Sequence, residues 1–277
     1  MEQTRGYFRV EGKIWGLANK NPFTNSTGSM RSLSFGIQSS KENSNFVQVG
    51  QWANSPLSVK VKAEGMEETF EIPEQEAIDY IKEHFKDGDS VYLNCRAEVN
   101  TYKQGRLDYI VSQIYIKSEP IDFDAEDFEE VNELNQAVVI TEKPENGRVK
   151  VGVTNYHGQM IEQELVLEDE DVREYFEENV RVGDLMKLSI YVHNKPIYEG
   201  EGEVTTRTTL KGKTVKSGGK KIKDRKLQLE VTDVDIQATE KSKYTRSEII
   251  KALEDAEYTP QNSSTLNTED DEDMMPY

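Results

Sequence analysis

Hydrophobic and polar residues alternate with a period of two along much of the chain. β-Branched residues fill these runs and Gly, Asn or Pro separates them, which is typical of short antiparallel strands. In the first part of the chain the runs lie at 7–15, 32–39, 46–52 and 57–65. In the second part they lie at 136–142, 147–155 and 159–168. The pattern predicts a mainly β protein with two groups of strands.

Each group of strands is followed by one segment with helical periodicity. Apolar residues spaced three or four apart form a stripe along each segment. These residues are Ala77, Ile78, Ile81 and Phe85 in the first segment and Val172, Tyr175, Phe176 and Val180 in the second. A Gly-Asp pair ends each stripe, at 88–89 and 183–184, and two more strands follow. About three strands, a helix and two strands are the order of a five-stranded OB barrel.

The two halves of the chain also resemble each other in sequence. Residues 77–99 align with 171–192 at an offset of 95, and residues 106–116 align with 226–236 at an offset of 120. The offset grows because the second copy carries extra residues between its last two strands. Two diverged copies of one module account for this pattern. We therefore expect two tandem OB-fold-like five-stranded barrels, each with one helix.

The expected domain boundaries follow from these copies. They are a first OB-fold-like domain over 1–120, an acidic linker over 121–134, a second OB-fold-like domain over 135–240, a short C-terminal helix over 241–257 and a disordered acidic tail over 258–277. The tail is expected to be disordered because it has too little apolar surface to bury.

The formal net charge of −18 argues at first against a nucleic-acid partner, since phosphate binding needs concentrated Lys and Arg. The acids are unevenly distributed, however. Residues 119–133, 162–178 and 254–277 hold 25 of the 52 acids and one basic residue, Arg173, so the rest of the chain carries a net charge of +6. A basic body with acidic segments is typical of interaction tails and of surfaces that bind polyanions. The alternative is that these acids are only solvated faces.

An OB barrel binds its ligand on the outer face of its middle strands and in two flanking loops. In the first strand Phe8, Val10 and Ile14 share one parity and are expected to be core, which leaves the other parity facing outward. Aromatic rings beside cations suit stacking on single-stranded bases. The candidate contacts are Arg9, Lys13, Trp15, Phe46 and Trp52, with Tyr92 and Arg96 on the fourth strand and Lys20, Phe23 and Arg31 in the polar connection 18–31. The alternative is that Trp15 and Trp52 cover a barrel end or dock the two domains.

The second copy carries a long insertion, 205–226, between its fourth and fifth strands. It holds nine basic residues against one acid, Asp224. The basic residues are Arg207, Lys211, Lys213, Lys216, Lys220, Lys221, Lys223, Arg225 and Lys226. Such a hairpin is suited to holding a sugar-phosphate backbone. The alternative is a solvated hairpin whose lysines protect a sheet edge.

No catalytic or metal-binding pattern stands out in the sequence. In KSGGKK the residue five positions before Gly219 is Thr214, so the spacing of a phosphate loop fails. The three histidines and the single cysteine have no zinc spacing. We therefore expect no enzyme activity, cofactor or metal. No apolar run is long enough for a membrane span and the start lacks a signal-peptide pattern, so a cytoplasmic protein is expected.

The chain ends in EDDEDMMPY, five acids from Glu269 to Asp273 followed by an apolar tip. This ending resembles the acidic tip of bacterial and bacteriophage single-stranded DNA-binding proteins, in which aspartates precede a hydrophobic residue, a proline and a terminal aromatic. The chain departs from that family in two respects. Tyr277 stands where phenylalanine is usual, and two modules occur where bacterial members typically have one and assemble as tetramers. The ligands of the zinc-containing phage type are missing.

The resemblance implies a protein that binds and protects single-stranded DNA during replication, recombination or repair and recruits partner enzymes through its tip. For a phage-encoded protein the place of action is the bacterial host cytoplasm. The resemblance is compatible with a monomer or an oligomer. The expected partner-binding residues are Asp270, Asp271, Asp273, Met275, Pro276 and Tyr277. Two alternatives remain. One is an RNA-binding protein with the same barrels, because stacking does not read the sugar; the other is an acidic adaptor that binds only proteins.

Overall fold

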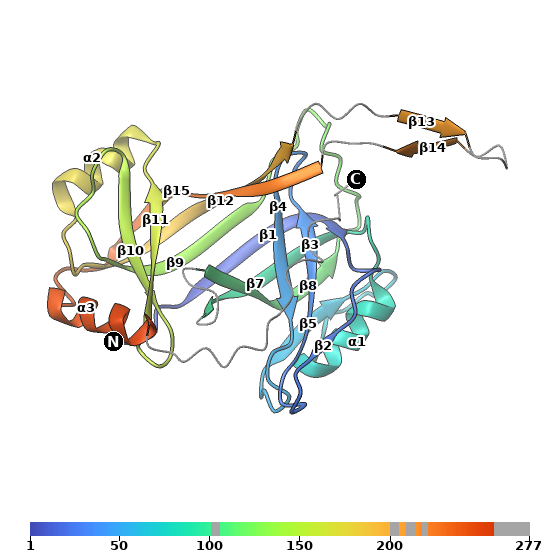
Figure 1. Ribbon diagram of the computed structural model, residues 1–277, viewed down its shortest axis with the longest axis horizontal. Helices are drawn as coiled ribbons and strands as arrows, with labels where there is room; N and C mark the ends of the chain where they lie inside the picture. The colour runs from blue at the N-terminus through green and yellow to red at the C-terminus, as the bar shows by residue number, and fades with distance from the viewer. Residues whose placement is uncertain (101–105, 200–204, 209–213, 218–220, 258–277) are drawn as a thin grey trace.

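The computed structural model describes residues 1–100, 106–199, 205–208, 214–217 and 221–257 (Figure 1). Strands dominate these residues and three helices accompany them, so the expected mainly β class is confirmed. The strands are β1 (Gly6–Trp15), β2 (Phe23–Thr24), β3 (Arg31–Gln38), β4 (Ser44–Val49), β5 (Ser58–Lys62), β6 (Phe70–Pro73), β7 (Ser90–Asn100), β8 (Arg106–Ile116), β9 (Asn132–Ile140), β10 (Arg148–Thr154), β11 (Met160–Val166), β12 (Leu185–Glu199), β13 (Thr205–Thr208), β14 (Thr214–Ser217) and β15 (Lys221–Glu240). The helices are α1 (Glu74–His84), α2 (Glu170–Asn179) and α3 (Arg246–Glu257).

In the first half of the chain five strands pair in a closed cycle, which we call the first cycle. β1 pairs with β3, β3 with β4, β4 with β8, β8 with β7, and β7 again with β1. Only the β4–β8 pairing is parallel. Helix α1 comes before β7, and the apolar stripe expected from the sequence is buried: Ala77, Ile78 and Ile81 lie in the hydrophobic core.

The second half repeats this arrangement in a second cycle. β9 pairs with β10, β10 with β11, β11 with β15, β15 with β12, and β12 again with β9. Here the β11–β15 pairing is the parallel one. Helix α2 comes before β12 and buries Phe176. The strand order and the place of the helix are therefore the same in both copies.

Two glycines show how the first strands of the copies correspond. The backbone N–H of Gly88 donates to the carbonyl of Ile14 at 2.8 Å, and that of Gly183 donates to the carbonyl of Ile140 at 2.9 Å. Both glycines have a φ of 92°, a left-handed conformation that residues with a Cβ rarely adopt. Ile14 and Ile140 are therefore equivalent, at an offset of 126.

The first strands of the two cycles also pair with each other. β1 and β9 are antiparallel, from Gly6 opposite Gln136 to Val10 opposite Asn132, with Phe8 opposite Leu134 at the centre. The offset of 126 makes Phe8 and Leu134 equivalent residues, so the pairing is symmetric about them. Both side chains are fully buried in a core that contains residues of both cycles. The two cycles thus form one continuous sheet.

The segment after the first cycle, residues 117–131, folds back on it, and we call this segment the strap. The backbone N–H of Lys117 donates to the carbonyl of Ser90 at 2.8 Å, and that of Ile121 donates to the Ser90 hydroxyl at 2.9 Å. Most of the acidic stretch expected to link two domains therefore lies against the first cycle. Strand β9 begins inside the expected linker range, at Asn132.

The segment after the second cycle folds back in the same manner. The backbone N–H of Tyr244 donates to the carbonyl of Gly183 at 3.0 Å. Helix α3 then packs Ile249 and Ala252 with Val139 and Met160 in a second, smaller apolar cluster. Residues 258–277, where the acidic tail was expected, lie outside the described part of the chain. The helices within the described ranges are too short or too polar to cross a membrane.

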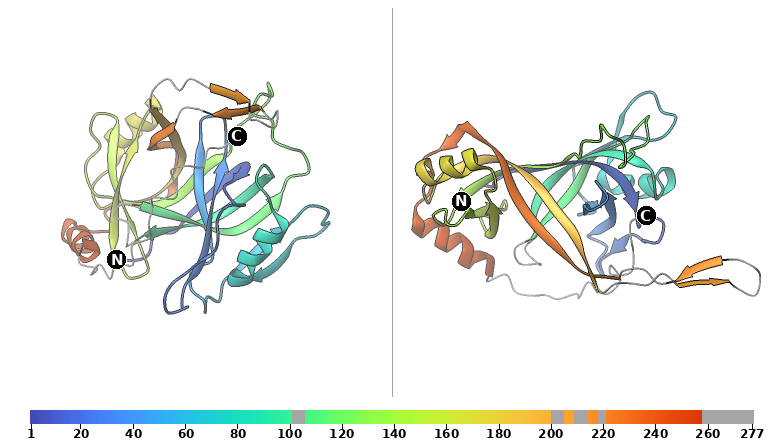
Figure 2. Two further views of the ribbon diagram at one scale, coloured as in Figure 1. Left: turned by 45° about the vertical axis from the view of Figure 1, so that its right-hand side comes forward. Right: turned by 90° about the horizontal axis from the view of Figure 1, so that it is seen from above.

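Strands β12 and β15 pair along their length and run from the second cycle across to the first (Figures 1 and 2). Partway along this pair, the backbone N–H of Asn194 donates to Asn43 Oδ1 at 2.8 Å. Lys195 Nζ lies 3.0 Å from Glu42 Oε2. The turn between β3 and β4 is therefore held against strands that belong to the second copy.

Candidate nucleic-acid interface

A row of three residues crosses the outer face of the first cycle. Trp15 on β1 lies opposite Gly36 on β3, and Gly36 lies opposite Phe46 on β4. The indole of Trp15 occupies the space above Gly36, where an added Cβ would lie 1.9 Å from Cε2 of the indole. The rings of Trp15 and Phe46 meet edge to face, with their centroids 5.1 Å apart. We call Trp15, Gly36 and Phe46 the aromatic row.

Arg225 of β15 covers this row. Its guanidinium carbon lies 5.6 Å from the centre of the Trp15 ring and 5.5 Å from the centre of the Phe46 ring. The same guanidinium donates to the hydroxyl of Ser44 at 2.6 Å. Sequence reasoning placed Arg225 in a loop of the second copy, and the structure brings it onto the face of the first.

The expectation that Trp15 is open to solvent is wrong, because its side chain is only 3% exposed. The outward parity was predicted correctly, but a strand from the other copy passes over it. The alternative, that Trp15 docks the two copies, fits this position. Its Nε1 is buried without a hydrogen-bond partner among the described residues, an uncommon state for an indole N–H.

The other aromatic residues expected on this face are more accessible. Phe46 is half-buried and Trp52 is 47% exposed. Five residues lie between them, including Gly50 with a left-handed φ of 79°, and Trp52 forms a bridge with Met30, just before β3. Between them Ser34 and Gln48 lie opposite each other, the first exposed and the second half-exposed. The face beyond the aromatic row is thus polar and open, with a second ring at its end.

Two predicted cations are engaged in ion pairs within the first cycle. Arg31 binds Asp79 on α1 through both terminal nitrogens, and this hydrogen bonding holds the pKa of Asp79 below its usual value. Arg96 lies 2.9 Å from Glu74, whose side chain is 1% exposed, and 3.2 Å from Glu98. Removing Arg96 would leave a buried carboxylate without its cation, so this residue has a structural task.

The remaining first-copy candidates are scattered over the same half of the molecule. Arg9 pairs with Glu133 at 2.8 Å, and Lys13 Nζ lies 4.9 Å from the centre of the Phe123 ring in the strap. Three further candidates have these positions: Tyr92 stacks on Tyr115 with centroids 6.0 Å apart, Phe23 lies on β2 opposite Ser32, and Lys20 accepts a bond from Lys82 through its carbonyl. The structure therefore gathers Lys13, Trp15 and Phe46, and leaves the others apart from them.

The basic insertion is described only in part. Arg207 lies on β13, Lys216 on β14, and Lys221 and Lys223 on β15, with backbones that the structure describes. Lys211, Lys213 and Lys220 lie outside the described residues. β13 and β14 pair with each other, from Thr205 opposite Ser217 to Thr208 opposite Thr214. In Figures 1 and 2 this hairpin extends beyond the far end of β12 and β15.

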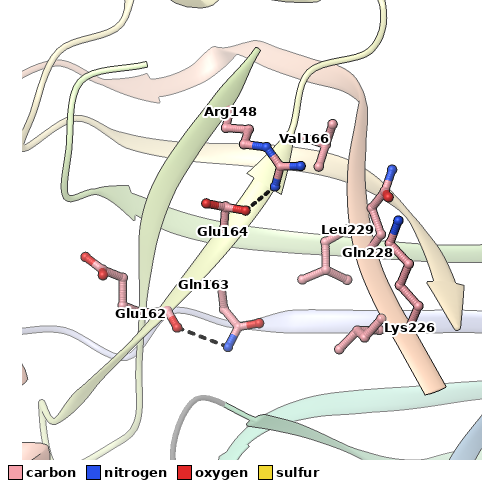
Figure 3. A pocket seen from close by; sticks show the side chains of 9 residues that line it. Arg148, Glu162, Gln163, Glu164, Val166, Lys226, Gln228 and Leu229 are labelled. Atoms are coloured by element: carbon pink, nitrogen blue, oxygen red, sulfur yellow. Dashed lines mark hydrogen bonds and ion pairs between the residues drawn. The ribbon is translucent and has the colours of Figure 1, made fainter. Parts of the chain in front are cut away.

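The second copy lacks an equivalent of the aromatic row. Because Ile140 corresponds to Ile14, Thr141 corresponds to Trp15. In the strand pairing of the second copy, Lys150 takes the place of Gly36 and Glu164 the place of Phe46. Lys150 pairs with Glu142 at 2.9 Å and with Glu162 at 3.6 Å. Glu164 pairs with Arg148 in a pocket of about 300 Å³ at the β11–β15 edge (Figure 3). The described residues that line this pocket include no aromatic side chain, so the two copies present different chemistry.

Sequence reasoning did not find three features of this interface. Gly36 supplies the space for Trp15, Ser44 receives Arg225, and the strap brings Phe123 to Lys13. A signal for the strap was present: Phe123 and Phe128 are the two aromatic residues in the acidic stretch 119–133, and their rings meet edge to face at 5.4 Å. Rings in a charged segment indicate a packed segment rather than a solvated one.

Comparison with known proteins gives one family match. The model of the YorF family matches residues 7–269. No curated protein matches the chain. Among solved structures the chain is similar to the wild-type single-stranded DNA-binding protein from Thermus aquaticus, with 10% identity, a TM-score of 0.38, and coverage of 84% of this chain and 91% of that one. A deletion mutant of the same Thermus aquaticus protein gives 9% identity, a TM-score of 0.41, and coverage of 84% and 93%. A likeness at this level assigns neither a fold nor a function.

Proposed function

The chain belongs to the YorF family, and we propose that it binds single-stranded DNA without sequence preference, through the outer face of the first cycle and the basic hairpin of the second copy. The protein is not an enzyme in this proposal. The observation that carries it is the aromatic row with a guanidinium over it. Rings beside a cation are what single-strand binding requires, and each stacked base contributes roughly 1–3 kcal/mol.

The proposal treats each cycle as an OB-type barrel. Support comes from the strand order, in which the third strand pairs in parallel with the fifth and a helix precedes the fourth. In such a barrel, oligonucleotides bind on the face formed by the second and third strands, between two loops. In the first cycle these strands are β3 and β4, which carry Gly36 and Phe46.

The two copies have different tasks in this proposal. The first supplies the stacking face, where bases contact Phe46 and, at the far end, Trp52. The second supplies Arg225 and the lysines of the insertion, which bind phosphates. Its own equivalent face is occupied by ion pairs around Lys150 and Glu164, and the described positions that match the aromatic row carry no ring for a base. One DNA strand therefore binds across both copies, rather than one DNA strand on each copy.

The buried N–H of Trp15 supports ligand binding at the row. An unpaired buried donor costs about 1–3 kcal/mol, so a fold retains one rarely. A nucleotide that moves the Arg225 side chain toward a phosphate would bring an acceptor near Nε1.

The acidic tip, Asp270 to Tyr277, is proposed to recruit replication or repair enzymes, as the resemblance of EDDEDMMPY implies.

A fluorescence titration tests the proposal. Oligo-dT, oligo-U and duplex DNA are added to the full chain at two salt concentrations; quenching of Trp52 reports stacking, and a change in Trp15 emission reports movement of Arg225. We expect quenching by oligo-dT, little by the duplex, and a logarithm of affinity that falls linearly with the logarithm of salt. Tighter binding of oligo-U would assign the face to RNA. Absence of any binding would support the adaptor alternative and refute the proposal.

Phe46→Ala and Arg225→Met complete this test. Phe46→Ala removes the half-exposed ring of the row, and Arg225→Met keeps the aliphatic stem but removes the charge. We expect both to weaken oligo-dT binding, and only Arg225→Met to lower the salt dependence as well. Tyr156→Ala is the matched control, because Tyr156 is a 72% exposed ring on the β10–β11 connection, away from the row.

A further inference from the structure

A second pocket, of about 310 Å³, lies where the two copies meet. Its walls come from the turn between β3 and β4, from the strap and from β12. Four aromatic rings line it. The strap supplies Phe123 and Phe128, and β12 supplies Tyr191 and His193, whose centroids are 4.6 Å apart.

Hydrogen bonds hold the wall from β12 against the turn. Asn43 Nδ2 donates to the hydroxyl of Tyr191 at 3.3 Å, and Asn43 Oδ1 accepts from the backbone of Asn194 at 2.8 Å. His193 Nε2 lies 2.7 Å from Glu230 Oε2. The rings of this wall are therefore held by partners on two different elements, the β3–β4 turn and β15, before any ligand arrives, which lowers the ordering cost of binding.

The pocket adjoins the aromatic row. Asn43 at its edge is followed by Ser44, the residue that accepts the hydrogen bond from Arg225. Lys13, two residues before Trp15 and on the same face of β1, has its ammonium 4.9 Å from the centre of Phe123. A strand that stacks on the row has this pocket beside it.

We propose that this pocket binds one nucleobase of the strand that the aromatic row holds, as a subsite of the proposed function on which it rests. Its rings suit the flat face of a base, and its carboxylates, Glu42 and Glu130, accept hydrogen bonds from base N–H groups. Its volume is at the lower end of the range for small-ligand sites, about 300–1,000 Å³. That size suits one base rather than a folded segment of another protein.

Two lysines at the pocket supply the charge for the flanking phosphates. The side chains of Lys41 and Lys195 are 59% and 49% exposed and pair with Asp124 and Glu42. Exposed ion pairs of this kind contribute little, so phosphates replace the carboxylates at small cost. An apolar peptide side chain would use the rings but leave both lysines without a function in the pocket.

The test is a length series of oligo-dT, from about 4 to 16 nucleotides, titrated against the full chain and against Phe128→Ala. Short oligonucleotides that reach only the row should bind both proteins equally. Long ones should bind Phe128→Ala about five- to 150-fold more weakly, the equivalent of one stacked base at roughly 1–3 kcal/mol. Tyr156→Ala again serves as the control and should match the wild type at every length.

The outcomes separate this proposal from the one on which it rests. If the wild type binds no oligonucleotide, both fail. If the wild type binds and Phe128→Ala matches it at all lengths, the subsite fails and the proposed function stands. Tighter binding by Phe128→Ala would show that the strap obstructs the strand, and would also overturn the subsite. His193→Gln removes a ring from β12 without touching the strap, so it decides the matter if Phe128→Ala does not fold.

Discussion

Substitution of Gly36 by Ala tests the geometry of the aromatic row directly. The added methyl carbon would lie 1.9 Å from Cε2 and 2.3 Å from Nε1 of Trp15. Carbon atoms in contact are about 3.5–4.0 Å apart, so the indole must move by roughly 1.6 Å or more. Phe46 and Arg225 limit that movement. The centre of the Phe46 ring lies 5.1 Å, and the guanidinium carbon of Arg225 lies 5.6 Å, from the centre of the indole ring. Overpacking of this kind costs about 1–3 kcal/mol of unfolding free energy.

Urea unfolding followed by tryptophan fluorescence and circular dichroism measures this cost. We expect a lower midpoint with an unchanged slope, and a native emission shifted to the red because Trp15 becomes hydrated. Oligo-dT affinity should fall as well, since the row loses its arrangement. Ser34→Ala, the next outward position on β3, is exposed and should change stability by less than about 0.5 kcal/mol. A Gly36→Ala protein with native stability and native emission would refute the placement of Trp15.

Three further predictions concern charge. Changing Lys213, Lys216, Lys220 and Lys221 to Ala should weaken oligo-dT binding. It should also reduce the slope of log affinity against log salt by about 0.7 for each lysine that binds a phosphate. An unchanged slope would favour the alternative that these lysines only protect a sheet edge. Deleting residues 268–277 should leave the urea midpoint unchanged and should raise oligo-dT affinity at low salt or leave it level; weaker DNA binding after the deletion would contradict this. The double substitution Pro276→Ala with Tyr277→Ala should abolish capture of a host replication or repair enzyme. For Asp184, burial raises the pKa, but hydrogen bonds from the backbones of Ser242 and Arg181 and from Lys241 outweigh burial and lower the pKa. The ionised carboxylate therefore stabilises the fold above its unfolded pKa of about 3.9, and this stabilisation is lost as pH falls through the folded pKa. The urea midpoints of wild type and Asp184→Asn should converge in acid, and a difference between them that does not depend on pH would refute this prediction.

The strands and helices were predictable because their signals are local. Phe8, Val10 and Ile14 alternate with polar residues and are buried, and the stripe from Ala77 to Ile81 faces the core, as the periodicity indicated. The equivalence of the two copies could also be found from Gly88 and Gly183, because only a glycine suits their conformation.

The candidate site was less predictable because it depends on contacts between distant residues. Parity placed Trp15 on the outer face, but its exposure is decided by Arg225, which is 210 positions away in the sequence and comes from the other copy. Whether Arg31 faces a ligand or Asp79 is likewise decided by the position of α1 against β3. No pattern within one strand contains this information, since packing between elements sets it.

The symmetric pairing of β1 with β9 is the contact that a twofold homodimer would make, formed here within one polypeptide. In a homodimer every substitution occurs twice, so a residue that improves one face also appears on its mate. Within one chain the two faces change independently, so Trp15, packed beneath Arg225, coexists with Thr141 at the matching place. Assembly also no longer depends on protein concentration, because the partner strand is covalently attached and its effective concentration stays fixed on dilution. A chain cut between residues 116 and 132 would lose the second advantage, and its two fragments, once separated, would each expose an unpaired strand edge.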